Sequence, residues 1–356
     1  MKTTTSREFD GARRRVLRAG LAAVSALAMP RPGAAATPPV QVRFLTPEEG
    51  ANALANTPGD TYYTHMRLLE SRSRTNSPMT GVSLADARIA VRDFEAAAVR
   101  QFTPAEKAGM RAAVERLQPV LAARAPLYAR TPWSFIKLGD EAEGGMPHTR
   151  GPHIVVPASM AAAFGRAAGE IASDPSSRRI GMLLNLLVHE QTHVLERAKP
   201  ALFEPLITDV FGFARMTPAP TTPWLETHEF VNPDGPDVVW AFPLDKIGGR
   251  GWLMPHLVVP DMPLPRMPDD FQSIGVEVAR TATGWQVVDG DAGAPKQRSL
   301  DQVPGYHAHF PFADEDFHPN EIAAVTLAHW ILQDVPDLAT RPLMPAVDAW
   351  ARKALA

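Results

Sequence analysis

The 356-residue sequence contains no cysteine. Disulfides, thiolate metal ligands, cysteine nucleophiles and lipid anchors on cysteine are therefore excluded. The sequence also has no run of 18 apolar residues after residue 36, so we expect no transmembrane helix in the mature chain. The remaining 320 residues are enough for one large core or for two lobes around a cleft.

The first 36 residues have the features of an export signal and carry a net positive charge. Arg13-Arg14-Arg15-Val16-Leu17-Arg18 precedes an apolar run over 19–29 and the small residues Ala34-Ala35-Ala36. The pattern resembles a twin-arginine signal, with Val16 where Phe is usual. This segment has a net charge of +5, so its removal changes the formal charge from −3 to −8. We expect a periplasmic or secreted protein that binds neither nucleic acid nor, after signal cleavage, a membrane.

The most informative segment is His189-Glu190-Gln191-Thr192-His193, an H-E-x-x-H pattern. Histidines four positions apart project from one face of a helix and can bind the same metal ion. Glu190 then lies beside them, where a carboxylate can act as general base on a metal-bound water. The flanking residues indicate a buried helix, since apolar side chains recur at Ile180, Leu183, Leu184, Leu187, Val188, Val194 and Leu195.

The order of helical and strand patterns predicts an α+β fold with a boundary near residue 198. We expect a lobe over 37–198, which has a small sheet and the motif helix, and a second lobe over 199–356. The predicted helices cover 85–100, 104–123, 158–172, 177–197 and 319–333, with a short one from 345. The predicted strands cover 133–138 and 153–157. Residues 37–80 show little periodicity, and residues 217–300, rich in Pro, Gly and Trp, predict irregular β structure.

A catalytic zinc site needs a third protein ligand, and Glu321 is the best candidate. It follows His318-Pro319-Asn320 at the start of a predicted helix. The alternative is that Glu321 only complements the dipole of that helix. Asp209 is the second candidate and Glu204 a further one, while Glu196 fits better as a partner of a ligand than as a ligand.

The motif His189-Glu190-x-x-His193 with a distant Asn320-Glu321 resembles the gluzincin branch of the zincin metallopeptidases. The resemblance implies a zincin-like fold with two lobes around a cleft, a single Zn²⁺ on His189, His193 and Glu321, and Glu190 as general base. Two features depart from the family pattern. The gap of 128 residues between His193 and Glu321 is long, and Val325 stands where an aspartate usually orients the first histidine.

Three further segments are candidates for contacts with a substrate. Hydrolysis of an amide passes through an oxyanion, and Tyr306 and His309 are the preferred donors to it, with His307 as another candidate. The strand around His148-Thr149-Arg150 and His153 predicts either an edge that pairs with an extended peptide or a purely structural edge. Trp224, Trp240 and Trp252 are expected in the core.

These patterns predict an exported zinc metallopeptidase that acts on a peptide or protein substrate. A zinc-dependent cell-wall amidase would use the same ligands with a different substrate. A non-catalytic, metal-containing binding protein is the third alternative, and it would need a fourth protein ligand.

Overall fold

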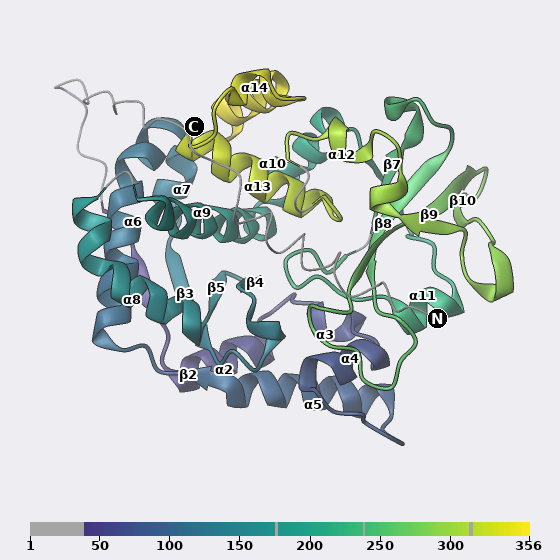
Figure 1. Cartoon of the computed structure of the whole chain (residues 1–356), viewed down its shortest axis with the longest axis horizontal. Helices are drawn as coiled ribbons and strands as arrows, with labels where there is room; N and C mark the ends of the chain where they lie inside the picture. Colours follow the sequence, from purple (N-terminus) through teal and green to yellow (C-terminus); the bar gives the residue numbers. More distant parts are fainter. Residues whose placement is uncertain (1–38, 175–176, 238, 313–315) are drawn as a thin grey trace, which may run out of the picture.

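The computed structural model describes residues 39–174, 177–237, 239–312 and 316–356 (Figure 1). The expected export signal over 1–36 lies outside the described residues and stays a prediction. The described chain is a mixture of helices and strands with two separate sheets, as the α+β prediction requires. Within the described ranges, no helix has the length and apolar character needed to cross a membrane.

The first sheet is mixed and forms the middle of a three-layer arrangement. Its strand order is β1-β3-β5-β4, with β2 paired to β3. β1 and β5 run parallel to β3, while β2 and β4 are antiparallel to their partners. The strands are β1 (Val42–Phe44), β2 (Val99–Arg100), β3 (Trp133–Leu138), β4 (His148–Arg150) and β5 (His153–Pro157).

The strands β3 and β5 are apolar on both faces because helices cover both faces. Phe135 and Ile154 belong to the core shared with α6, α8 and α9, whereas Ile136 and Val155 pack with α2 and the end of α5. Figure 1 shows α9 above these strands and α2 and α5 below them. The helices are α2 (Pro47–Asn56), α3 (Tyr62–His65), α4 (Leu68–Thr75), α5 (Leu84–Ala98), α6 (Pro104–Arg124), α7 (Pro126–Arg130), α8 (Ala158–Ser173) and α9 (Arg178–Ala198).

The local signals in this part of the sequence are confirmed where they were strong. β3 and β5 have the predicted bounds, and α6 begins with a capping box between Thr103 and Glu106. Residues 37–80, where the sequence shows little periodicity and no element was predicted, contain β1, α2, α3 and α4.

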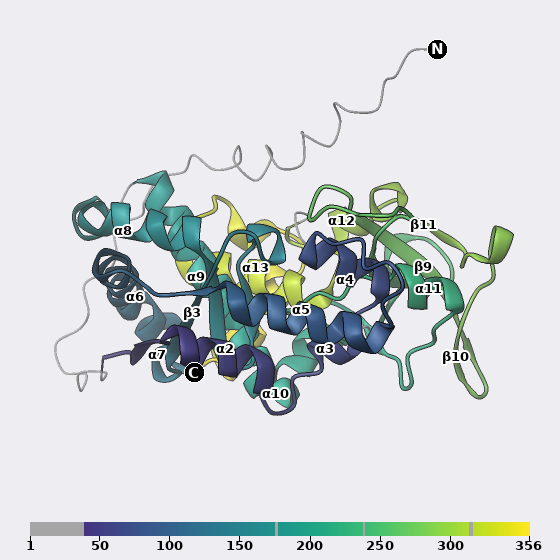
Figure 2. The ribbon, with the colours of Figure 1, turned by 90° about the horizontal axis from the view of Figure 1, so that it is seen from below.

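The second sheet corrects the prediction of irregular β structure over 217–300. It has six strands in the order β10-β9-β8-β7-β6, with β11 also paired to β9, and every pairing is antiparallel. Figures 1 and 2 place β9 and β10 at the opposite end of the molecule from α6 and α8. The strands are β6 (Ala214–Arg215), β7 (Trp240–Pro243), β8 (Trp252–Val258), β9 (Gln272–Thr281), β10 (Gly284–Val287) and β11 (Gln297–Ser299).

Helices of the second half of the chain pack onto the motif helix. α13 contacts α9 over its length, and the largest apolar core includes residues from Phe102 to Leu355. The division of the chain near residue 198 stays a prediction. The helices are α10 (Pro200–Pro205), the π-helical turn η2 (Leu206–Val210), α11 (Pro223–His228), α12 (Tyr306–His309), α13 (Pro319–Leu332) and α14 (Met344–Ala354). Short 3₁₀ turns are η1 (Glu143–Gly145), η3 (Leu244–Ile247), η4 (Asp291–Gly293), η5 (Leu300–Gln302) and η6 (Leu338–Thr340).

Candidate metal centre

Three side chains from two helices converge at the contact between α9 and α13. His189 and His193 project from one face of α9, and Glu321 lies in the first turn of α13. His189 Nε2 is 3.2 Å from His193 Nε2 and 3.2 Å from Glu321 Oε2, and His193 Nε2 is 3.5 Å from the same oxygen. We call His189, His193 and Glu321 the triad.

The triad has the geometry of a metal site. Ligand atoms at zinc distances in a tetrahedral arrangement are about 3.3 Å apart, close to the three separations found here. Two imidazoles and one carboxylate also form a donor set that suits a divalent ion. Within the described residues, these are the three side chains that are close enough together to hold a metal ion.

The structure selects among the candidates for the third ligand. The Glu321 carboxylate contacts both histidines, so it does more than complement the helix dipole. Asp209 is exposed and accepts a hydrogen bond from Thr208, while Glu204 pairs with Arg215 at 3.6 Å. Packing of α13 on α9 therefore brings Glu321, rather than either alternative, to the histidines.

Glu196 orients one of the histidines, as the sequence suggested. Its Oε2 accepts a hydrogen bond from His193 Nδ1 at 2.9 Å and lies 3.2 Å from Asn320 Nδ2. A carboxylate on the far nitrogen of a ligand histidine fixes the ring orientation and increases its basicity. Glu196 contacts the second histidine of the motif, whereas the aspartate expected at the position of Val325 would orient the first, His189.

The neighbouring segment 230–237 supplies residues that sequence analysis missed. Asn232 Nδ2 donates to Glu321 Oε1 at 2.5 Å, which leaves Oε2 facing the histidines. Asp234 Oδ1 accepts from the backbone N–H of Thr149 at 2.6 Å. No motif marks Asn232 or Asp234, since each acts through a contact with a residue more than 80 positions away.

Glu190 is buried beside the triad. The Thr149 hydroxyl lies 3.2 Å from both the backbone carbonyl and Oε2 of Glu190. Burial raises the pKa of Glu190 to about 8, and the nearby Asp234 carboxylate adds to this increase. A carboxyl group with a pKa near neutrality can both accept and donate a proton in this pH range.

The electrostatics of the triad show how strongly Glu321 acts on its neighbours. Burial alone would lower the pKa of His193, but the Glu321 and Asp234 carboxylates raise it well above its ordinary value. Burial would likewise raise the pKa of Glu321, yet the two histidines lower it well below its ordinary value. The site therefore favours a positive charge between the imidazoles and the carboxylate.

The hydrogen bonds at the outer edge of β4 favour the interpretation of this strand as a structural edge rather than as an edge that pairs with a peptide. The Thr149 N–H donates to Asp234, and the Thr149 carbonyl accepts from Arg197 Nη2 at 3.2 Å. Arg197 Nη2 also bonds to the carbonyl of Pro233. The peptide groups of Thr149 that an extended peptide would need are therefore already bonded to side chains.

Tyr306, His307 and His309, the candidate oxyanion donors, have contacts that are separate from the triad. Tyr306 is fully buried, and its hydroxyl donates to the backbone carbonyl of Asp316 at 2.9 Å. His309 packs against Phe242 and Phe310. His307 pairs with Asp301 and Asp316. Among the described residues, the contacts given above for Tyr306, His307 and His309 do not include a residue of the triad. Their role as oxyanion donors stays a prediction.

Comparisons of the chain with family models, curated proteins and solved structures find no match. The interpretation of the triad therefore depends on its own geometry and chemistry.

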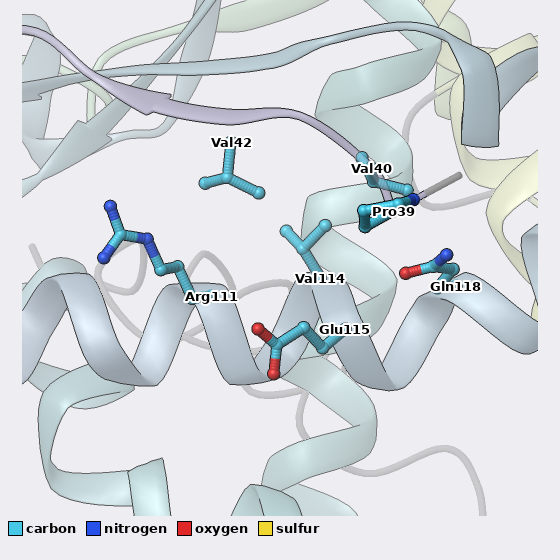
Figure 3. Close-up of a pocket in the computed structure, with 7 residues that line it drawn as sticks. All are labelled: Pro39, Val40, Val42, Arg111, Val114, Glu115 and Gln118. Carbon is cyan, nitrogen blue, oxygen red and sulfur yellow. The ribbon is translucent and has the colours of Figure 1, made fainter.

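Two cavities of the structure differ in their position relative to the triad. The smaller, of 180 Å³, lies between β1 and α6, and Figure 3 shows Arg111 and Glu115 of α6 on one side and Val42 on the other. The larger, of 480 Å³, has Glu196 and Asn320 in its wall and so adjoins the triad.

Proposed function

We propose that this protein is a zinc-dependent peptidase of the zincin type, in which the triad holds the ion and Glu190 is the general base. The observation that carries the proposal is the convergence of His189 Nε2, His193 Nε2 and Glu321 Oε2, with the Glu190 carboxylate buried next to them. The same helix supplies two ligands and the base, as the H-E-x-x-H pattern requires.

A catalytic site is favoured over a structural zinc site. Structural sites are closed by four protein ligands, whereas three side chains of the described residues form this group. His189 is 13% exposed, so one ligand is in contact with solvent. A closed structural site would also leave no purpose for Glu190.

Each residue then has a defined task. A bound zinc ion supplies Lewis-acid polarisation of the scissile carbonyl and lowers the pKa of a water molecule. Glu190 Oε2, held by Thr149, takes a proton from the attacking water and passes it to the nitrogen of the leaving amine. Glu196 holds the ring of His193, and Asn232 holds Glu321 with Oε2 directed to the ion.

The substitution Glu190→Gln tests the proposal because it removes the base and preserves the shape of the side chain. We expect unchanged zinc content by elemental analysis and a fall of about 10²–10⁴-fold in hydrolysis of a denatured protein. Glu226→Gln, on the exposed side of α11, is the control and should retain activity. Wild-type turnover in Glu190→Gln would remove the mechanism, and turnover of purified peptidoglycan alone would favour the amidase alternative.

A further inference from the structure

The 480 Å³ cavity is a built pocket next to the triad. Its wall includes the C-terminal end of α9, the start of α10, the β4–β5 turn, the 57–61 loop, the segment 230–237 and the start of α13. Its volume lies in the range of pockets that bind small ligands. The Glu196 carboxylate connects it to the triad, since one oxygen holds His193 and the residue also lines the cavity.

Three buried polar atoms at this wall have no hydrogen-bond partner. They are Glu196 Oε1, Arg197 Nε and His318 Nε2. Glu196 and His318 are 5% and 6% exposed. His318 Nδ1 accepts a hydrogen bond from the Asn320 N–H, so the neutral ring carries its proton on Nε2. The wall therefore offers one acceptor, on Glu196, and two donors, and such buried groups are costly to leave unpaired.

The charges of the wall are predominantly negative. Five carboxylates and two guanidiniums line the cavity. Asp60 pairs with Arg150 and Glu204 with Arg215. Of the other three carboxylates, Glu196 accepts from His193, Asp234 accepts from the Thr149 N–H, and Asp237 lies 3.4 Å from His65 Nε2. The second guanidinium of the wall, that of Arg197, bonds to backbone carbonyls. A cationic group is the complement of this surface.

Part of the wall is apolar. Val194, Phe203, Ile207 and Trp240 line the cavity along with the charged residues. An acidic end combined with an apolar wall matches a long aliphatic side chain that carries a positive charge at its tip.

We propose that this cavity binds a lysine or arginine side chain of the substrate, with its charged end at Glu196 Oε1 and the neighbouring carboxylates. The inference depends on the proposed function, because it assigns a specificity pocket to the same site. Glu196 would connect the pocket to the triad, since the carboxylate that would meet the substrate cation is the one that orients His193.

The experiment measures binding rather than turnover. Zinc-loaded Glu190→Gln protein is titrated by calorimetry with three capped amino-acid amides: acetyl-arginine amide, acetyl-norleucine amide and acetyl-glutamate amide. We expect the arginine amide to bind about 10-fold or more tightly than the norleucine amide, since a charge-assisted hydrogen bond distinguishes them. The glutamate amide should bind weakest of the three. Equal affinities for the three amides would overturn the proposal.

A charge reversal in the wall gives a second measurement. Asp237→Lys should weaken binding of the arginine amide about 10-fold or more and narrow its advantage over the glutamate amide. The control is Asp245→Lys at an exposed position of η3, which should change neither affinity. If Asp237→Lys fails to fold, the ligand series on the parent protein still decides the question.

The outcomes separate the two proposals. Preferential binding of the arginine amide without any peptide hydrolysis would remove the proposed function and keep the pocket. Peptide hydrolysis with equal binding of the three amides, or with no effect of Asp237→Lys, would keep the peptidase and remove the pocket.

Discussion

Two buried groups of charged side chains differ in how their charges are balanced. The first, which we call the arginine network, contains its own cations. Arg74 pairs with Glu70 at 2.7 Å and with Glu143, and Arg150 pairs with Asp60 at 2.8 Å and with Glu95 at 3.0 Å. Burial raises the pKa of Glu95 well above its ordinary value, and the Glu143 carboxylate adds to the effect, while Arg150 opposes it.

The triad has no such cation. Its buried Glu321 faces two imidazoles and the amide of Asn232, and no lysine or arginine contact is found for Glu321 among the described residues. Buried charges need a partner of opposite sign or a metal. The arginine network therefore contains the cations that balance its carboxylates, whereas the triad could hold a metal ion in that role. Burial is common to the two groups, and the presence of arginine is what distinguishes them.

The largest expected effect on stability comes from removing a cation from the arginine network. Arg74→Met leaves Glu70 and Glu143 buried without their partner, so we expect a loss of about 3–5 kcal/mol in the free energy of unfolding, measured in urea. The control Arg92→Met, whose side chain is 40% exposed, should change it by less than about 0.5 kcal/mol. Similar stability in the two variants would contradict the distinction drawn above.

Substitutions in the triad should change the affinity for zinc rather than the free energy of unfolding. We expect Glu321→Ala to weaken zinc binding by more than about 100-fold in a chelator competition, because removing a ligand should cost more than removing a residue that only orients one. Circular dichroism should show that the fold is retained. Asp209→Ala, which changes the other ligand candidate, should bind zinc as the unmodified protein does. The reverse result would move the third ligand to Asp209.

A smaller loss is expected where a residue only orients a ligand. Glu196→Gln keeps the size of the side chain that contacts His193 but removes its charge, and should weaken zinc binding about 10–100-fold. Glu204→Gln, also in the cavity wall, serves as the control. Zinc affinity that is unchanged in Glu196→Gln would show that the contact does not support the metal site.

The smallest effect is expected at an ion pair that is less deeply buried. Lys137 Nζ lies 2.8 Å from Glu106 Oε1. Burial alone would raise the pKa of Glu106, but the hydrogen bonds from Lys137 and the Thr103 backbone lower it below 4.5. A lowered pKa in the folded state stabilises the protein above about pH 4.5, and this contribution is lost as the pH falls through the folded value.

Glu106→Gln should therefore lower the free energy of unfolding at pH 7 by about 1–2 kcal/mol. The difference from the unmodified protein should shrink on acidification, when urea unfolding is repeated below pH 4. Glu115→Gln, exposed on the same helix, should show neither effect. A difference that persists in acid would mean that the pair acts through packing rather than charge.

Local sequence signals determined much of the first half of the described chain. The capping box of Thr103 and Glu106 marked the start of α6, and strand-like residue patterns marked β3 and β5. The spacing of His189 and His193 determined that both rings leave one face of α9. Each of these features depends on residues a few positions apart, so the order along the chain is enough to specify it.

Only the tertiary structure decided the rest. The six-stranded sheet was not predicted because its order depends on the pairing of β9 with β8, β10 and β11, which no single strand reveals. Asn232 meets Glu321 across 89 positions, and the choice of Glu321 over Asp209 follows from the packing of α13 on α9. The sequence determined that His189, Glu190 and His193 lie on one helix. Bringing Glu321 to them required the burial of distant apolar surfaces against each other, because that packing brings its carboxylate to the two imidazoles.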